Sequence, residues 1–258
     1  MATRLLIALV LVPVLAYVGL CGLMYAKQRD LTYFPQFTRV DAARTNFELR
    51  RGDVVLRGWS MNPGQRHALI YFGGNAESIQ NMRENLAAWF PEHSHYLLAY
   101  RGYGASDGRP EEALLFADAL ALFDHVKNQT GTEVVSVMGR SLGSGVASYI
   151  ASQRPVHRLV LITPFDSLAG VAGHHYPWLP VDLLIRDRFD SARHLADFRG
   201  PVLIVSAGRD QVIPAQSTDR LAASLPVPPE VLMLPLANHD TALAESTEWQ
   251  PVAEYLRR

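Results

Sequence analysis

The first strongly apolar segment of the chain runs from Leu5 to Ala26 and contains no charged residue. Arg4 precedes it, and Lys27 and Arg29 follow it. A helix rises about 1.5 Å per residue, so this segment spans about 33 Å, enough to cross a hydrocarbon core of about 30 Å. We therefore expect an uncleaved, single-pass membrane anchor.

Two other interpretations of this segment stay open. A secretory signal peptide needs small residues before its cleavage site, and neither Gly19-Leu20-Cys21 nor Met24-Tyr25-Ala26 fits that pattern well. A buried core helix is rarely uncharged over such a length. The flanking basic residues are almost balanced, so the positive-inside rule leaves the orientation open, with an extracytoplasmic catalytic domain slightly favoured.

Beyond an extended linker at Asp30–Arg44, short apolar runs alternate with segments of helical periodicity. This alternation predicts an α/β fold, with a mostly parallel central sheet and helices on both faces. The first two strands form a hairpin. The predicted strands are Thr45–Arg50, Val54–Met61, Ala68–Phe72, Tyr96–Tyr100, Val134–Met138, Leu159–Ile162, Val202–Val205 and Val231–Leu234, and the predicted helices are Ser78–Phe90, Glu111–Asn128, Leu142–Arg154 and Glu248–Arg258.

One long segment, Pro164–Gly200, interrupts the alternation. It is too long for a plain loop in a compact domain. It carries Tyr176 and Trp178 beside two prolines, then an amphipathic run near Val181–Phe189. We expect either a small helical cap over the carboxyl end of the sheet or an ordinary crossover helix with a long entry loop.

The composition limits the classes of protein. The 258 residues, 48% of them hydrophobic, suit one catalytic domain at residues 31–258 after an anchor or signal peptide at residues 1–30. A net charge of −1 gives no general attraction to nucleic acid. The lone cysteine, Cys21, excludes an intrachain disulfide and any cysteine-based zinc site.

The segment Gly139–Gly143 has the pattern GxSxG, with Ser141 at its centre. It lies between an apolar strand and a helix of small residues, which is the setting of a nucleophile elbow. A serine nucleophile needs a base that is itself oriented by an acid. Asp210 and His239 follow the last two predicted strands in the expected chain order, and Asp187 and Asp240 are weaker candidates for the acid.

An oxyanion hole needs two preorganised N–H groups. We expect one to be the backbone N–H of Leu142, directly after the nucleophile. The other is predicted in the loop after the strand Ala68–Phe72, at the backbone N–H of Asn75.

Several longer segments carry a resemblance to a known group. The chain from about Leu31 onward resembles the Bem46-like α/β hydrolases, related to the ABHD13 and ABHD17 types, which include depalmitoylases and proteins described as serine peptidases. The resemblance implies the α/β-hydrolase fold, and an N-terminal membrane segment is common in that group. The segments that carry it are Tyr100–Gly108, Gly139–Gly145, Thr163–Leu168, Tyr176–Pro180, Asp187–Ser191 and the two segments around Asp210 and His239.

Two positions depart from that group. Gly73 stands where a histidine usually precedes Gly-Asn-Ala, which affects the side-chain support of the oxyanion loop. Ala99 stands where an acid usually ends the strand, which leaves Arg101 without its usual partner. We further expect Arg140 to pair with an acid such as Asp166, with contact to an anionic substrate as the alternative.

These features together predict a serine hydrolase acting on an ester, thioester or amide bond, most simply a carboxylesterase or acyl thioesterase. A serine peptidase and a non-catalytic membrane-tethered scaffold are the alternatives. The expected partners are an acyl ester, thioester or peptide substrate and the membrane, without nucleic acid, metal or cofactor. Tyr103 and Trp178 are candidates to line an acyl pocket, although aromatic core packing explains them equally well.

Overall fold

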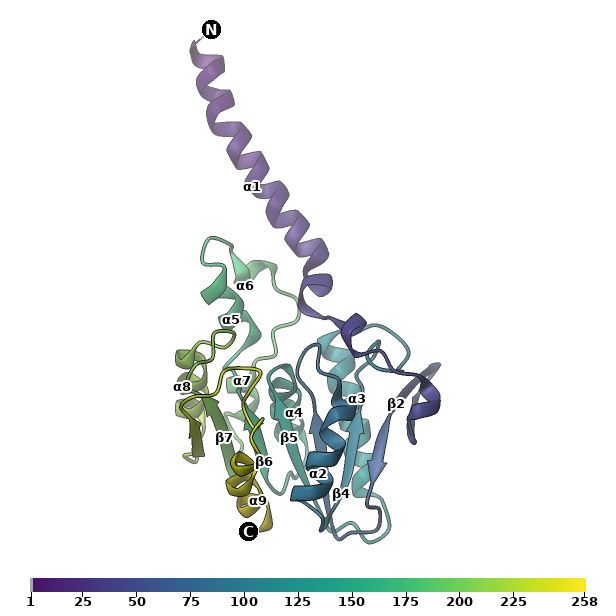
Figure 1. Ribbon diagram of the computed structural model, residues 1–258. Helices are drawn as coiled ribbons and strands as arrows, with labels where there is room; N and C mark the ends of the chain where they lie inside the picture. The colour runs from purple at the N-terminus through teal and green to yellow at the C-terminus, as the bar shows by residue number, and fades with distance from the viewer. Residues whose placement is uncertain (1) are drawn as a thin grey trace.

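The computed structural model describes residues 2–258, and within them eight strands form one sheet in the order β1-β2-β4-β3-β5-β6-β7-β8 (Figure 1). β2 pairs antiparallel with β1 and with β4, and the remaining neighbours are parallel. The strands are β1 Phe47–Arg51, β2 Val54–Met61, β3 His67–Phe72, β4 His93–Leu98, β5 Val134–Arg140, β6 Leu159–Ile162, β7 Val202–Ala207 and β8 Glu230–Leu234.

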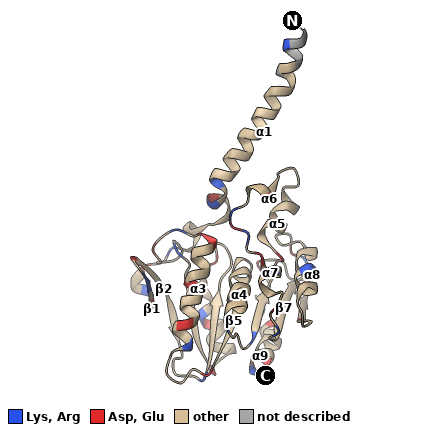
Figure 2. Ribbon diagram, turned by 180° about the vertical axis from the view of Figure 1, so that it is seen from behind, with Lys and Arg blue, Asp and Glu red and all other residues tan. Residues whose placement is uncertain are grey.

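Helices cover both faces of this sheet. α2 and α9 lie on the face nearer the viewer in Figure 1, and the view from behind in Figure 2 places α3, α4 and α7 on the other face. The mostly parallel sheet with helices on both faces is therefore confirmed. The helices of this body are α2 Arg83–Trp89, α3 Glu112–Lys127, α4 Leu142–Gln153, α5 Leu168–His175, α6 Val181–Leu184, α7 Ser191–Leu195, α8 Ala215–Ser224 and α9 Trp249–Arg257.

The central strands form the core. Leu69, Ile70 and Tyr71 of β3 are fully buried, because helices cover the sheet on both sides. β4 begins three residues before its predicted start and ends two residues before its predicted end. Its first residues include His93 and His95, which are buried although they are polar, so the apolar pattern did not reveal them.

The N-terminal helix α1 extends from Ala2 to Thr32. In Figure 2 its charged residues are confined to its two ends. Within residues 2–258, α1 is long and apolar enough to cross a membrane, a property that membrane anchors share with signal sequences. The predicted extended linker is partly wrong, because α1 continues through its first residues and two 3-10 turns follow, at Pro35–Thr38 and Ala42–Arg44.

The long segment between β6 and β7 contains three short helices, α5, α6 and α7. α5 and α6 lie at the carboxyl end of the sheet, on the side from which α1 leaves the body (Figure 1). α7 returns along the sheet and packs beside α4, as a crossover helix does. The amphipathic run near Val181–Phe189 is helical only over α6.

Candidate active site

Ser141, His239 and Asp210 form one hydrogen-bonded chain at the carboxyl ends of β5, β8 and β7. His239 Nε2 lies 2.9 Å from Ser141 Oγ, and His239 Nδ1 lies 2.8 Å from Asp210 Oδ2. The side chains of His239 and Asp210 are only 12% and 7% exposed. The structure thus brings together the three residues predicted from the sequence, in a geometry that allows proton transfer from the serine hydroxyl to His239.

The backbone at Ser141 is strained. It has a φ of 50° and a ψ of −118°, a conformation that non-glycine residues rarely adopt. The strand β5 ends at Arg140 and α4 begins at Leu142, so the serine occupies a single-residue turn between them. This turn exposes the hydroxyl toward His239 at the helix N-terminus, as in a nucleophile elbow.

Glycines make this turn possible. A Cβ on Gly143 would lie 2.1 Å from the carbonyl oxygen of Phe72, and a Cβ on Gly139 would lie 2.2 Å from the carbonyl oxygen of Gly143. Both clashes involve backbone atoms, which no side-chain rotation relieves. The first and last positions of the GxSxG pattern are therefore fixed by the close approach of β5, α4 and β3.

We expect Gly143→Ala to destabilise the fold by about 1–3 kcal/mol or more, because β3 and α4 must separate to admit the methyl group. Thermal unfolding followed by circular dichroism in detergent measures the change. Gly173→Ala is the matched control, since a Cβ there meets nothing within 4 Å. Equal melting temperatures for the two variants would contradict the packing argument.

The carboxylate of Asp210 is held in its ionised form. Burial raises the pKa of Asp210, but hydrogen bonds from His239 and from the backbone N–H groups of Ile213 and Val212 outweigh burial, so the pKa lies below its ordinary value. Asp210 therefore remains charged at neutral pH, and it can stabilise a positive charge on His239.

The predicted oxyanion donors lie on the two sides of Ser141. Leu142 is the first residue of α4, so its N–H has no intrahelical partner. The N–H of Gly74 donates to Glu77 Oε2 at 2.7 Å, whereas the N–H of Asn75 donates to no other group within residues 2–258. Asn75 is thus the better placed of these two amides to receive a ligand oxygen.

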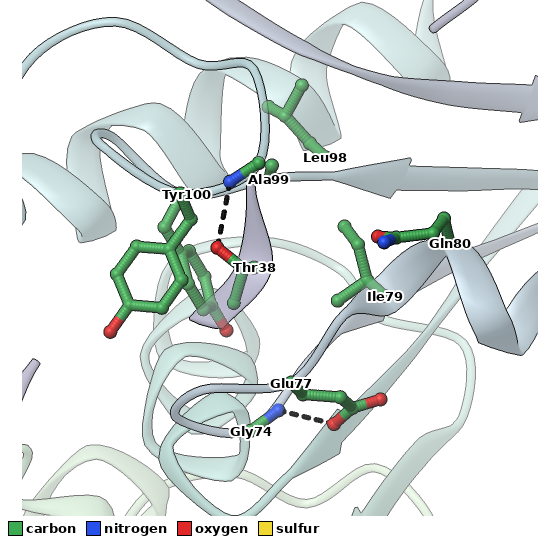
Figure 3. A pocket seen from close by; sticks show the side chains of 10 residues that line it. Thr38, Gly74, Glu77, Ile79, Gln80, Leu98, Ala99 and Tyr100 are labelled. Atoms are coloured by element: carbon green, nitrogen blue, oxygen red, sulfur yellow. Dashed lines mark hydrogen bonds between the residues drawn. The ribbon is translucent and has the colours of Figure 1, made fainter. Parts of the chain in front are cut away.

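Glu77 supports this loop, a role that the sequence did not suggest. Its carboxylate accepts hydrogen bonds from Gly74 N and from the Tyr71 hydroxyl, the latter at 2.6 Å. A Cβ on Gly73 would lie only 2.3 Å from the Ile79 side chain. The histidine that usually stands at this position would therefore fit only if Ile79 moved. Figure 3 shows Glu77 bonded to Gly74 beside a cavity of about 10 Å³, which has room for about one water molecule.

Arg140 pairs with an acid, as predicted, but that acid is Glu77 and not Asp166. Asp166 instead binds Arg220 and Ser217, at 2.6 Å from the guanidinium Nε of Arg220. Arg140 donates to the backbone carbonyls of His239 and Asp240, each at 3.0 Å, and its Nη1 lies 3.7 Å from Glu77. The guanidinium therefore ties the loop that carries His239 to the loop after β3.

The other singled-out side chains have structural partners. Arg101 pairs with Asp118 of α3, which replaces the acid missing at Ala99. Tyr103 is buried and donates its hydroxyl hydrogen to Asn75 Oδ1, so core packing and not an acyl pocket explains it. Trp178 is exposed on the segment between α5 and α6.

The end of α1 is hydrogen-bonded to this site. The Thr32 carbonyl accepts from the Asn75 side chain, and Phe34 N donates to Asn75 Oδ1 at 3.2 Å and to the Tyr103 hydroxyl at 3.0 Å. Asp187, one of the two weaker candidates for the acid, is buried and binds Arg29 of α1. No local sequence pattern predicts these contacts, because they join segments about 40 to 160 positions apart.

Two open cavities flank His239. One, of about 270 Å³, is lined by Gly74, Asn75 and Ser141 among others, and the second, of about 360 Å³, by Val212, Leu236 and their neighbours. Within residues 2–258 no group of three or more His, Cys, Asp or Glu side chains is arranged to hold a metal ion. The site thus offers a hydroxyl nucleophile, an oriented base, free backbone amides and space for a substrate.

Comparisons with known proteins agree with this fold. The family model described as an alpha/beta hydrolase domain matches residues 77–253. An uncharacterised protein of Mycobacterium tuberculosis, Rv2307c, is 35% identical over 249 residues, covering 90% of this chain and 88% of its own length. The lysophosphatidylserine lipase ABHD12 of Danio rerio is 31% identical over 140 residues, covering 47% of this chain and 37% of its own length.

Among solved structures, the esterase Pf2001 of Pyrococcus furiosus has the same fold. It superimposes with a TM-score of 0.68 at 18% identity, covering 82% of this chain and 91% of the esterase. The predicted fold class is confirmed by this likeness together with the family match.

Proposed function

Because the chain belongs to the α/β hydrolase family, we propose that it is a serine hydrolase that cleaves a carboxylic ester or thioester through an acyl-enzyme intermediate. The observation that carries the proposal is the hydrogen-bonded chain of Ser141, His239 and Asp210. Within that family, we propose that the chain belongs to the Bem46-like group. The relatedness to a lipase supports an acyl ester as the substrate, and an amide substrate would use the same groups.

In the first step Ser141 Oγ attacks the acyl carbonyl carbon while its proton passes to His239 Nε2. Asp210 stabilises the imidazolium that forms. The backbone N–H groups of Leu142 and Asn75 stabilise the negative charge on the carbonyl oxygen, and the loss of one such donor typically costs about 2.7–4 kcal/mol. The leaving alcohol or thiol takes the proton from His239, and the acyl group stays on Ser141.

Water completes the cycle. It attacks the acyl carbon while His239 accepts its proton, and Ser141 then recovers that proton as the carboxylic acid leaves. The strained turn at Ser141 and the donors from two loops favour this reaction, because they are in place before the substrate binds. We propose that α1 anchors the enzyme in the membrane, since it is the long apolar helix of the described chain.

A fluorophosphonate probe tests the nucleophile directly. We expect the full chain in detergent to be labelled and Ser141→Ala to remain unlabelled, because the probe phosphorus bonds to an activated serine oxygen. Ser152→Ala, a change farther along α4, is the matched control and is expected to keep full labelling. Equal labelling of the wild-type protein and Ser141→Ala would refute the assignment.

A further inference from the structure

The segment between α5 and α6 carries an exposed apolar cluster. We define residues 176–183 as the cap tip; in it, Tyr176 is 46% exposed, Trp178 53% and Leu183 84%. The Tyr176 and Trp178 rings meet edge to face, with centroids 6.3 Å apart. Tryptophan and tyrosine are the residues enriched where a membrane meets water. The charged residue of the cap tip, Asp182, is paired with Arg188 at 2.7 Å.

The cap tip lies against α1, well above the point where that helix joins the body. The Tyr17 hydroxyl donates to the Trp178 carbonyl at 2.8 Å, and the Gln28 side chain donates to the Leu184 carbonyl at 2.9 Å. Tyr17 and Gln28 are separated by about 16 Å along the helix axis. The segment from Trp178 to Leu184 therefore follows α1 along much of its lower half.

These contacts set the depth of the cap tip in a membrane. A membrane-spanning helix needs at least about 17 residues, so a span that begins at Leu5 reaches Cys21, which lies beyond Tyr17. The backbone of Trp178 is thus level with a turn of α1 that even the shortest span includes. For that shortest span, Tyr17 lies four residues, or about 6 Å, inside the boundary at Cys21, which is the depth of an interfacial segment.

We infer that the cap tip inserts into the membrane surface beside α1, and that the substrate is a long-chain acyl ester or thioester that enters the site from the bilayer. The partner of the apolar cap tip is lipid, because the cap tip lies against α1, whose own surface is apolar and is proposed to lie in the bilayer. The substrate part of the inference rests on the proposed function.

A route from the cap tip to the catalytic residues supports the substrate class. The ring of His175, at the end of α5, lies 2.8 Å from the Val212 carbonyl, so the cap segment contacts the loop that carries Asp210. Val212 and Leu236 are 48% and 74% exposed, and both line the cavity of about 360 Å³ beside His239. An acyl chain leaving the bilayer would meet these two apolar side chains at a cavity whose other lining residues are polar.

The depth of the cap tip is measured first, without reference to catalysis. The full chain carrying Ser141→Ala is inserted into phosphatidylcholine vesicles with brominated acyl chains, which quench nearby tryptophan fluorescence. Trp59 and Trp249 are buried in the body and Trp89 is half-buried at the end of α2, whereas Trp178 is exposed. We expect strong quenching that is mostly lost when Trp178→Phe is added. Equal quenching with and without Trp178, or failure of the chain to float with vesicles, would overturn the insertion.

Activity is measured next, on two substrates. We expect Trp178→Glu and Leu183→Glu each to lower the hydrolysis of a long-chain ester in vesicles about tenfold or more, because a charged side chain would replace the proposed apolar contact with lipid. Hydrolysis of a soluble acetate ester should stay within about twofold, since the triad is untouched. Val227→Glu, at a position that is 41% exposed on the loop before β8, is the control and should leave both activities unchanged.

The outcomes separate the two proposals. Equal losses on vesicle-borne and soluble esters, or no loss on either, would overturn the membrane route of the substrate. A wild-type chain that hydrolyses neither ester and takes no fluorophosphonate label would refute the proposed function, while the quenching experiment would still decide whether the cap tip is inserted.

Discussion

Replacing His239 with alanine is expected to lower kcat for a short p-nitrophenyl ester by about a millionfold, as the loss of the base does in other serine hydrolases. The physical reason is that His239 is placed to accept the Ser141 proton, its Nε2 lying 2.9 Å from Ser141 Oγ. The measurement is a progress curve with the full chain in detergent, at an enzyme concentration high enough to follow the residual rate. A loss below about tenfold would show that His239 is not the base.

Asp210→Asn separates orientation from proton transfer. We expect a loss of about 10⁴-fold in kcat, because an amide does not hold the histidine in the reactive tautomer or stabilise its positive charge. Asp219→Asn, at an exposed position of α8, is the matched control and should keep wild-type activity. Loss of activity in both variants would mean that the effect does not come from the contact with His239.

Acidification is expected to produce the second large effect, on stability. Burial lowers the pKa of both His93 and His95 to about 4, because a charged ring would have to leave water. The unfolded chain takes up these protons below about pH 6.5 and the folded chain does not, so stability is complete above that pH and is lost as the pH falls toward 4. Each histidine should cost about 2 kcal/mol by pH 5.

Urea unfolding of the full chain in one detergent at pH 7.5 and pH 5 measures this loss. His95→Leu removes one titrating ring, so its stability should fall by about 2 kcal/mol less than that of the wild-type protein between the two pH values. Leu97→Val, on the same buried strand, should shift stability equally at both. An unchanged pH dependence in His95→Leu would refute the assignment to this side chain.

The same two histidines show why part of the fold was missed in the sequence. Apolar runs revealed the strands that helices cover on both faces, such as β3 and β6. β4 is as deeply buried, but its first half has the sequence His93-Ser94-His95, and polar residues are ordinarily exposed. A hydrophobic pattern predicts burial from the average exposure of each residue type, and a buried histidine departs from that average.

The residues of the proposed triad were predictable because the fold fixes where they fall along the chain. Ser141, Asp210 and His239 each follow a strand, and strand ends can be found from local pattern. The supporting contacts were not predictable in the same way. Arg140 was expected to pair with an acid such as Asp166, whereas in the structure it lies beside Glu77 and binds two backbone carbonyls, which no sequence pattern marks.

The junction between α1 and the body has a consequence for any protease that acts near the membrane. Thr32 and Phe34 are bonded to the Asn75 side chain, and Asn75 carries the proposed oxyanion donor. Cleavage just after Phe34 would release the body from the bilayer and would also remove the groups that hold this loop. Shedding would then inactivate the enzyme, because the released fragment would be folded but would lack hydrolase activity.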